Sequence, residues 1–345
     1  MIATRIPVTG PSAWRPADFA GPDAYSVTLT PVQRAGLDRA LAAAGADRRP
    51  PEEMSAADFA LGDLAPDVAA WRDEVLGGRG FVVLRGLDGY SPERLTAIFW
   101  GLGAHIGRAV SQSSMGDRIG HVTDVGGQDR RERAYRNSRE LTLHTDRCDV
   151  IGMACLEPAM RGGVSGYASA HTVYNEILAT RPDLLEPLFA GFRYHRRGEE
   201  LPGEPPITAA PVPVLSEWEG ELSVVFLRAY IEMAAKDLGQ PLAERELAAL
   251  DAFEEVSRRA DVKLEFTLGR GEVIFFNNCT MLHNRTAFED GPDPARKRHL
   301  LRLWLMLDGR RPLAPAVHAY KGTQGIAGRD VASTYYTGTA LPDRY

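Results

Sequence analysis

Stretches of apolar residues bounded by glycine or turn residues recur along the chain and predict its strands. Residues 80–86 and 272–276 are the clearest examples, because their β-branched and aromatic side chains run together next to glycine. Further strands are expected at residues 151–156, 222–227, 262–268 and 299–307. Short strands separated by Gly and Pro turns are typical of sandwiches and barrels.

A helical spacing of apolar residues appears between these strands. Val32, Leu37 and Leu41, for example, lie at helical intervals. Helices are therefore expected at residues 31–44, 91–100, 172–179 and 242–258. Strands in the majority, with a few helices between them, favour a mainly β fold with helical cover. The expected architecture is a double-stranded β-helix of the jelly-roll, cupin-like type.

Composition narrows the range of partners. The formal net charge is −6, which gives no basic surface of the kind that nucleic acid or an anionic membrane needs. No apolar run is long enough to span a bilayer and the first ten residues lack a signal-peptide core, so a cytoplasmic protein is expected. The three cysteines show no metal spacing and favour reduced thiols. A small molecule is the expected partner, and a homo-oligomer stays open.

Two imidazoles and one carboxylate form the most informative chemical pattern. Alternate side chains of an extended strand share a face, so His144 and Asp146 are expected to project together. A distant His would complete a facial triad that holds non-heme Fe(II) with open coordination positions, and His283 is the candidate. A single His-x-Asp arises by chance, and an isolated His is more often structural. The order of these three residues and their strand context distinguish the set from a chance match.

Basic residues follow His283 at a short interval. Arg298 and Arg302 lie in a run that alternates with other side chains, so they are predicted to share one strand face. Arginine offers a permanently charged, bidentate fork for a carboxylate in a partly buried pocket. Arg296 and Lys297 lie in a mixed-charge loop, where an ordinary solvated turn is the alternative.

With these residues the chain resembles the taurine dioxygenase and clavaminate synthase group of Fe(II)- and 2-oxoglutarate-dependent oxygenases. The resemblance extends from residue 80 to residue 307 and is most specific at residues 144–146, 162–165, 283–286 and 298–302. It implies that His144, Asp146 and His283 are the catalytic iron ligands. It also implies that Ser165 and Arg298 contact the carboxylate of 2-oxoglutarate, and that Arg302 supports either this cosubstrate or an anionic substrate.

The resemblance further implies the reaction. Fe(II), 2-oxoglutarate and O2 would oxidise a C–H bond of a small, anionic or amino-acid-like metabolite, with succinate and CO2 as co-products. A carboxylate at position 146, where halogenating relatives carry a small residue, favours hydroxylation, desaturation or ring formation over chlorination. Two alternatives stay open. One is a non-heme Fe(II) dioxygenase that does not use 2-oxoglutarate and needs no role for Ser165 or Arg298. The other is a catalytically silent jelly-roll binding module.

The length of 345 residues suits one large domain or two average ones, and no segment has the composition of a flexible linker. We therefore expect a single catalytic domain over residues 1–345. Residues 1–76 would form a helical extension packed on the core, residues 77–310 the double-stranded β-helix, and residues 311–345 a C-terminal tail.

Several polar residues outside the triad are weaker candidates. His171 is a candidate cap of the helix after Ser169, and Asn278 a candidate for shaping the turn before the second His. For Cys148 a small, buried apolar role is expected rather than contact with iron. A polar, Gly-containing stretch suits either a substrate wall or a plain loop, and its candidates are Gln112, His121, Tyr135 and Asn137.

Overall fold

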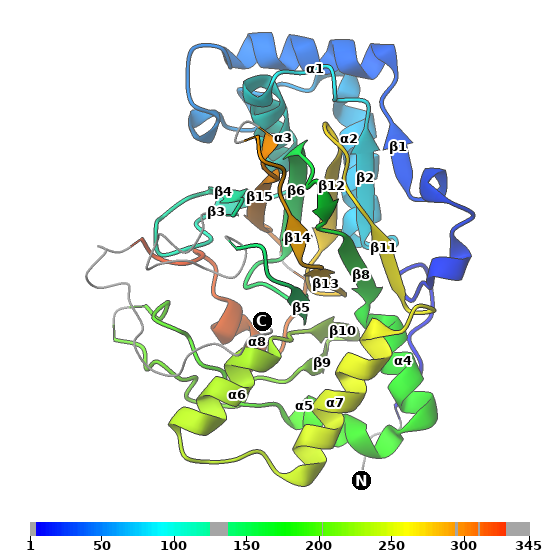
Figure 1. Cartoon of the computed structure of the whole chain (residues 1–345), viewed down its shortest axis with the longest axis vertical. Coiled ribbons are helices and arrows are strands. Elements are labelled where there is room, and N and C mark those ends of the chain that lie inside the picture. The colour runs from blue at the N-terminus through cyan, green and yellow to red at the C-terminus, as the bar shows by residue number, and fades with distance from the viewer. Residues whose placement is uncertain (1–4, 125–136, 202, 294–295, 310, 329–345) are drawn as a thin grey trace.

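The computed structural model describes residues 5–124, 137–201, 203–293, 296–309 and 311–328. Strands occupy the centre, with helices above and below them (Figure 1). The helices are α1 (Pro31–Ala44), α2 (Ala65–Leu76), α3 (Pro92–Ile106), α4 (Ala170–Thr180), α5 (Leu185–Ala190), α6 (Arg228–Asp237), α7 (Glu244–Arg258) and α8 (Pro315–Lys321).

The strands form two main sheets and two short ribbons. They are β1 (Ser26–Thr28), β2 (Phe81–Arg85), β3 (Arg108–Val110), β4 (Ile119–Val122), β5 (Leu141–His144), β6 (Val150–Glu157), β7 (Arg161–Gly162), β8 (Ser165–Ser169), β9 (Leu215–Trp218), β10 (Glu221–Val224), β11 (Lys263–Phe266), β12 (Val273–Asn277), β13 (Met281–Arg285), β14 (Phe288–Glu289) and β15 (His299–Met306).

The larger sheet has seven strands in the order β1-β2-β12-β6-β15-β3, and β4 also pairs with β15. Only the β1–β2 pairing in this sheet is parallel. The smaller sheet has the order β11-β8-β13-β5 and is antiparallel throughout. The ribbons pair β9 with β10 and β7 with β14. Two sheets of mainly antiparallel strands make up the predicted double-stranded β-helix.

The alternation of side chains along β12 explains how the layers are held together. Val273 and Phe275 pack into the apolar cluster under α1, α2 and α3, whereas Ile274 and Phe276 pack into the cluster between the two sheets. All five residues of the strand are buried because both of its faces are covered. Complete burial of each large apolar side chain contributes about 1.5–3 kcal/mol to folding.

Local sequence signals explain where the principal helices begin. Thr30 Oγ1 accepts a hydrogen bond from the Gln33 amide, and Gln33 Oε1 accepts one from the Thr30 amide, which forms a capping box at the start of α1. The helix ends at Gly45, whose φ of 63° lies in the left-handed region that glycine adopts without strain. Ser91 caps α3 in the same way by accepting from the Arg94 amide.

The structure confirms every predicted helix and strand, with shifted ends. The helix expected at residues 91–100 continues to Ile106, and the strand expected at residues 222–227 ends at Val224. Other elements were not predicted individually, among them α2, α8, β8 and β13. Within the described residues, no helix combines the length and apolar character that crossing a membrane requires.

Candidate metal centre

His144 and His283 lie side by side on two neighbouring strands. They are directly opposite each other where β5 pairs with β13, and their ring centroids are 4.2 Å apart. The ligand atoms of His144, Asp146 and His283 all lie within 4.8 Å of one another. The convergence of these three side chains, separated by some 140 positions in the sequence, is therefore present in the fold.

The protonation of the two imidazoles suits metal binding. The Nδ1–H of His144 donates to the Thr142 carbonyl at 2.7 Å, which leaves the lone pair of Nε2 for a metal. Burial lowers the pKa of His144, and the nearby Asp146 opposes this shift. Burial, followed by repulsion from His144, lowers the pKa of His283 well below its usual value. Both side chains are therefore neutral near pH 7, the form in which His binds metals.

Asp146 reaches the cluster by a route that differs from the prediction. Strand β5 ends at His144, so strict strand alternation does not place Asp146. The backbone and hydroxyl of Thr145 instead bond to the backbone of Phe226 at 2.8 and 2.9 Å. The Asn278 side chain accepts from the Asp146 amide at 2.9 Å and donates to its carbonyl at 2.7 Å. Asn278 thus fixes the segment that carries the ligand, a more specific role than shaping a turn.

The carboxylate of Asp146 has two donors on β15. Trp304 Nε1–H donates to Asp146 Oδ2 at 2.9 Å, and Arg302 Nη1 lies 3.3 Å from the same oxygen. The side chain of Gln112 accepts from Arg302 Nε at 2.6 Å and donates to the Arg302 carbonyl at 2.9 Å. Gln112 is fully buried and therefore positions Arg302 rather than lining a substrate wall. Trp304 was not predicted, because an indole in an apolar strand resembles any core residue.

Two buried guanidinium groups share the ring of Phe288. The carbon at the centre of the Arg285 guanidinium lies 4.8 Å from the ring centroid, and that of Arg298 lies 4.9 Å from it. Nε and Nη1 of Arg285 and Nη1 of Arg298 are buried without a hydrogen-bond partner among the described residues. Burial lowers the pKa of Arg298 to about 10, and burial together with Arg298 lowers that of Arg285 to about 9. Such groups favour an anion between them.

The predicted cosubstrate residues lie around this arginine pair. Ser165 begins β8 directly opposite Arg285, and its side chain bonds to that of Tyr167. A Cβ on Gly163, whose φ is 65°, would lie 3.1 Å from Arg298 Nε, so the glycine lets the guanidinium approach the backbone. Ser165 and Arg298 therefore lie in one region with Arg285, which was not among the predicted site residues.

The remaining candidates have other roles. His121 bonds to His299 at 2.8 Å on the sheet, the Asn137 carbonyl accepts from Arg285 at 2.8 Å, and Tyr135 lies outside the described residues. Cys148 is fully buried in the cluster between the sheets, as an apolar role requires. Arg296 and Lys297 are exposed, as expected for a solvated turn.

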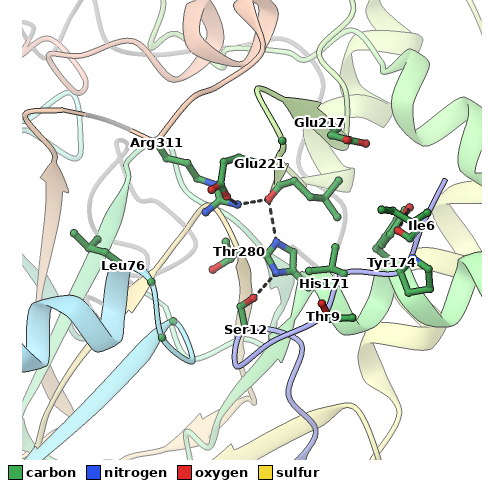
Figure 2. A pocket seen from close by; sticks show the side chains of 17 residues that line it. Ile6, Thr9, Ser12, Leu76, His171, Tyr174, Glu217, Glu221, Thr280 and Arg311 are labelled. Carbon is green, nitrogen blue, oxygen red and sulfur yellow. Dashed lines mark hydrogen bonds and ion pairs between the residues drawn. The ribbon is translucent and has the colours of Figure 1, made fainter. Parts of the chain in front are cut away.

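His171 lies apart from the metal cluster, in a pocket of about 370 Å³ (Figure 2). His171 was the candidate cap of α4, and this prediction is wrong: the cap is Ser169, whose side chain accepts from the Thr172 amide. Its imidazole instead bonds to Ser12 Oγ at 2.8 Å and to the Leu222 carbonyl at 3.0 Å (Figure 2). The residue therefore joins the N-terminal segment to β10. None of the three clustered metal-ligating side chains lines this pocket.

A model of the taurine catabolism dioxygenase TauD, TfdA family matches residues 46–304. The chain belongs to this family. Within it, the chain is similar to FR-33289 synthase of Streptomyces rubellomurinus, with 29% identity over 91% of this chain and 95% of that protein. It is also similar to the taurine hydroxylase-like protein SAT17 of Stachybotrys chartarum, with 30% identity over 86% of this chain and 79% of that protein.

Solved structures share the TauD, TfdA fold with this chain. An asparagine oxygenase in complex with Fe(II), 2S,3S-3-hydroxyasparagine and succinate has a TM-score of 0.64 at 19% identity, over 88% of this chain and 100% of that one. The non-heme iron oxygenase OrfP with Fe and alpha-ketoglutaric acid has a TM-score of 0.62 at 16% identity, over 88% of this chain and 99% of that one. The predicted double-stranded β-helix is confirmed.

The family settles the class of enzyme. The chain is an Fe(II)- and 2-oxoglutarate-dependent dioxygenase that oxidises a C–H bond of a small metabolite, as the sequence predicted. The structure suits both groups, because two imidazoles and a carboxylate are the donor set of non-heme iron. The nitrogens of Arg285 and Arg298 that lack a partner among the described residues suit a carboxylate of the cosubstrate.

Proposed function

We propose that His144, Asp146 and His283 bind the iron of this dioxygenase. The observation that carries the proposal is the 4.8 Å cluster of their ligand atoms. Both imidazoles are held neutral by burial, and Nε2 of His144 is left available by the bond of Nδ1 to Thr142. Three protein ligands on one side leave the other coordination positions for the cosubstrate and O2.

We further propose that Arg298 and Arg285 hold the far carboxylate of 2-oxoglutarate, with Ser165 beside them. Arg285 lies two residues after His283 on β13, and its charge contributes to the lowered pKa of His144. The pair of Arg285 and Arg298 therefore begins next to the metal cluster. The buried nitrogens that have no partner among the described residues would donate to the carboxylate. Arg302 is engaged with Asp146 and Gln112, and in this proposal it positions the metal ligand.

Iron and 2-oxoglutarate, when bound, supply the oxidation of an unactivated C–H bond, with succinate and CO2 as co-products. The residues of this chain bind and orient these two groups and shield them from water. Trp304 and Arg302 fix the carboxylate that carries negative charge to the metal. Asn278 holds the backbone of the same ligand, and the apolar cluster between the sheets excludes water. The presence of Asp146 favours hydroxylation, desaturation or ring formation over chlorination.

The proposed substrate is a small, anionic or amino-acid-like metabolite. Two structural neighbours are named for complexes with 3-hydroxyasparagine and L-Arg, which supports this class without identifying a compound. We propose that the chain acts as a single catalytic domain, because one apolar cluster joins Leu37 of the N-terminal extension to Leu305 of β15. Its three buried free thiols support a reducing compartment such as the cytoplasm.

The test is an anaerobic titration with Fe(II) and 2-oxoglutarate, read by the visible charge-transfer band of the complex. We expect the band in the wild-type protein and its loss in His144→Ala. His121→Ala, which changes a His outside the cluster, should keep it. Succinate release from a panel of anionic metabolites then identifies the substrate. A wild-type band that forms with Fe(II) but without any dependence on 2-oxoglutarate would contradict the proposed cosubstrate site.

A further inference from the structure

Arg147 follows the proposed iron ligand Asp146 directly, and the proposed function gives it no role. Its Nε donates to the Tyr320 carbonyl at 3.1 Å, and its guanidinium lies 5.4 Å from the centroid of the Tyr320 ring. Nη1 is buried and has no hydrogen-bond partner among the described residues. No carboxylate in the described part of the chain lies within the 4.0 Å of an ion pair with it. Among the described residues, Arg147 therefore forms no ion pair.

Arg196 adds a second positive charge beside it. The ring of Tyr194, two residues before Arg196, lies 4.9 Å from the ring of Tyr320 that Arg147 contacts. Only 8% of Arg196 is exposed, and its Nε is buried with no partner among the residues described here. Its Nη1 lies 3.5 Å from Glu204 Oε2. One carboxylate thus faces two guanidinium groups that lie close enough to repel each other.

An uncompensated buried charge is costly, and a proton cannot leave arginine readily to relieve it. The cost falls when an oxyanion binds, because the planar guanidinium donates two parallel hydrogen bonds to it. The carboxylate of 2-oxoglutarate is already accounted for by Arg285 and Arg298 at Phe288. The charge at Arg147 is therefore available for a different anion.

We propose that Arg147, assisted by Arg196, binds an oxyanion group of the substrate. This inference rests on the proposed function, since it takes Asp146 as an iron ligand. Arg147 is the residue next to Asp146, and neighbouring Cα atoms are about 3.8 Å apart, so its backbone lies beside that of the proposed iron ligand. In this proposal the reacting carbon of a small metabolite lies at the metal and its charged end lies at Arg147. Arg302, the earlier candidate for this role, is occupied by Asp146 and Gln112.

The proposed ligand is an oxyanion that is either tetrahedral or planar, and simple ions of each shape distinguish the two. The protein is loaded anaerobically with Fe(II) and 2-oxoglutarate and titrated with inorganic phosphate, sulfate or acetate at constant ionic strength. The readouts are the unfolding temperature and the charge-transfer band. We expect at least one ion to raise the unfolding temperature of the wild type in a saturable way. Arg147→Met should lower the affinity for that ion about tenfold or more, and Arg147→Lys should retain part of the affinity.

Two controls separate binding from a structural role. Arg193→Met makes the same change in the segment of Arg196, at a guanidinium that donates to the Thr208 carbonyl at 2.6 Å, and it should bind the ion like the wild type. Arg147→Met should unfold at the same or a higher temperature without the ion, because it removes an uncompensated charge; a structural arginine would instead lower it.

The outcomes distinguish this inference from the proposed function. A normal charge-transfer band with unchanged ion affinity in Arg147→Met would overturn the inference alone, as would a wild-type holoenzyme that binds none of the three ions. Absence of the band in the wild type would overturn the proposed function. Loss of ion binding in Arg147→Met with a normal band would support both.

Discussion

Trp304 donates the hydrogen bond that fixes the carboxylate of the metal cluster, and Trp304→Phe removes this donor while keeping an aromatic ring. Nε1–H lies 2.9 Å from Asp146 Oδ2, and only 1% of Trp304 is exposed. Arg302, at 3.3 Å, stays as the second donor. Because loss of a group that orients a metal ligand weakens metal binding about 10–100-fold, we expect a loss of about 1.4–2.8 kcal/mol in Fe(II) affinity.

The same substitution also lowers the stability of the metal-free protein. A hydrogen bond to a charged acceptor contributes about 1.5–3 kcal/mol, and the smaller ring leaves a void that adds to the loss. Trp100→Phe is the matched control, because Trp100 is 4% exposed and its Nε1–H donates to the Met54 carbonyl at 2.8 Å, a neutral acceptor. It should lose stability but keep the Fe(II) affinity of the wild type.

The assay combines urea unfolding of the metal-free proteins with anaerobic Fe(II) titration of all three. The proposed role of Trp304 predicts that the two tryptophan variants differ more in Fe(II) affinity than in stability. Equal Fe(II) affinity in Trp304→Phe and the wild type would refute it, since the indole would then contribute only to packing.

Three further predictions concern other parts of the molecule. Burial lowers the pKa of His171 from 6.5, so the contribution of this residue to stability is complete above pH 6.5 and is lost as the pH falls. Urea unfolding down to about pH 5 should show this loss, and the free energy of unfolding should depend less steeply on pH in His171→Gln. An equal pH dependence in the two proteins would contradict the prediction. Arg285→Met should weaken the binding of 2-oxoglutarate about tenfold, measured by anaerobic titration of the charge-transfer band, and should leave the binding of Fe(II) alone unchanged. An unaltered affinity for 2-oxoglutarate would show that Arg285 is not part of the site. Gly152→Ala should cost about 1–3 kcal/mol by urea unfolding, because its Cβ would lie 2.8 Å from Phe275 and 2.9 Å from Phe99, and an unchanged midpoint would mean that these rings can move apart.

Sequence patterns predicted the fold where apolar runs were long or regular. The run ending at Asn277 gave β12, and the spacing of Leu37 and Leu41 gave α1. Strand β8 escaped prediction because its sequence, Ser165 to Ser169, consists of small residues apart from Tyr167 and has no apolar run, and it is held by pairing with β13 and β11 on both sides. Tertiary pairing supplies stability that a local propensity does not encode.

The sequence predicted that His144, Asp146 and His283 lie close together, and their ligand atoms do, although one step of the reasoning was wrong. Asp146 lies beyond the end of β5, where side-chain bonds of Asn278 orient it. Strand alternation would have found Arg285, had β13 been predicted, because the residue two positions after His283 shares its strand face. A buried guanidinium nitrogen without a hydrogen-bond partner among the described residues, such as Nη1 of Arg147, has no signature in a sequence, because it depends on which residues the fold brings near.

The pairing of β5 with β13 also sets limits on how the chain can change length. His144 and His283 face each other across one rung of this ladder. The ladder already contains a register shift between this rung and the pair of Arg285 with Leu141, whereas an inserted or deleted residue next to either imidazole would turn that imidazole to the opposite side of the sheet and abolish the cluster. A length change in the connections outside the paired strands leaves that rung intact. Descendants of this gene are therefore free to vary the loops around the two strands and constrained to conserve the count of residues inside them.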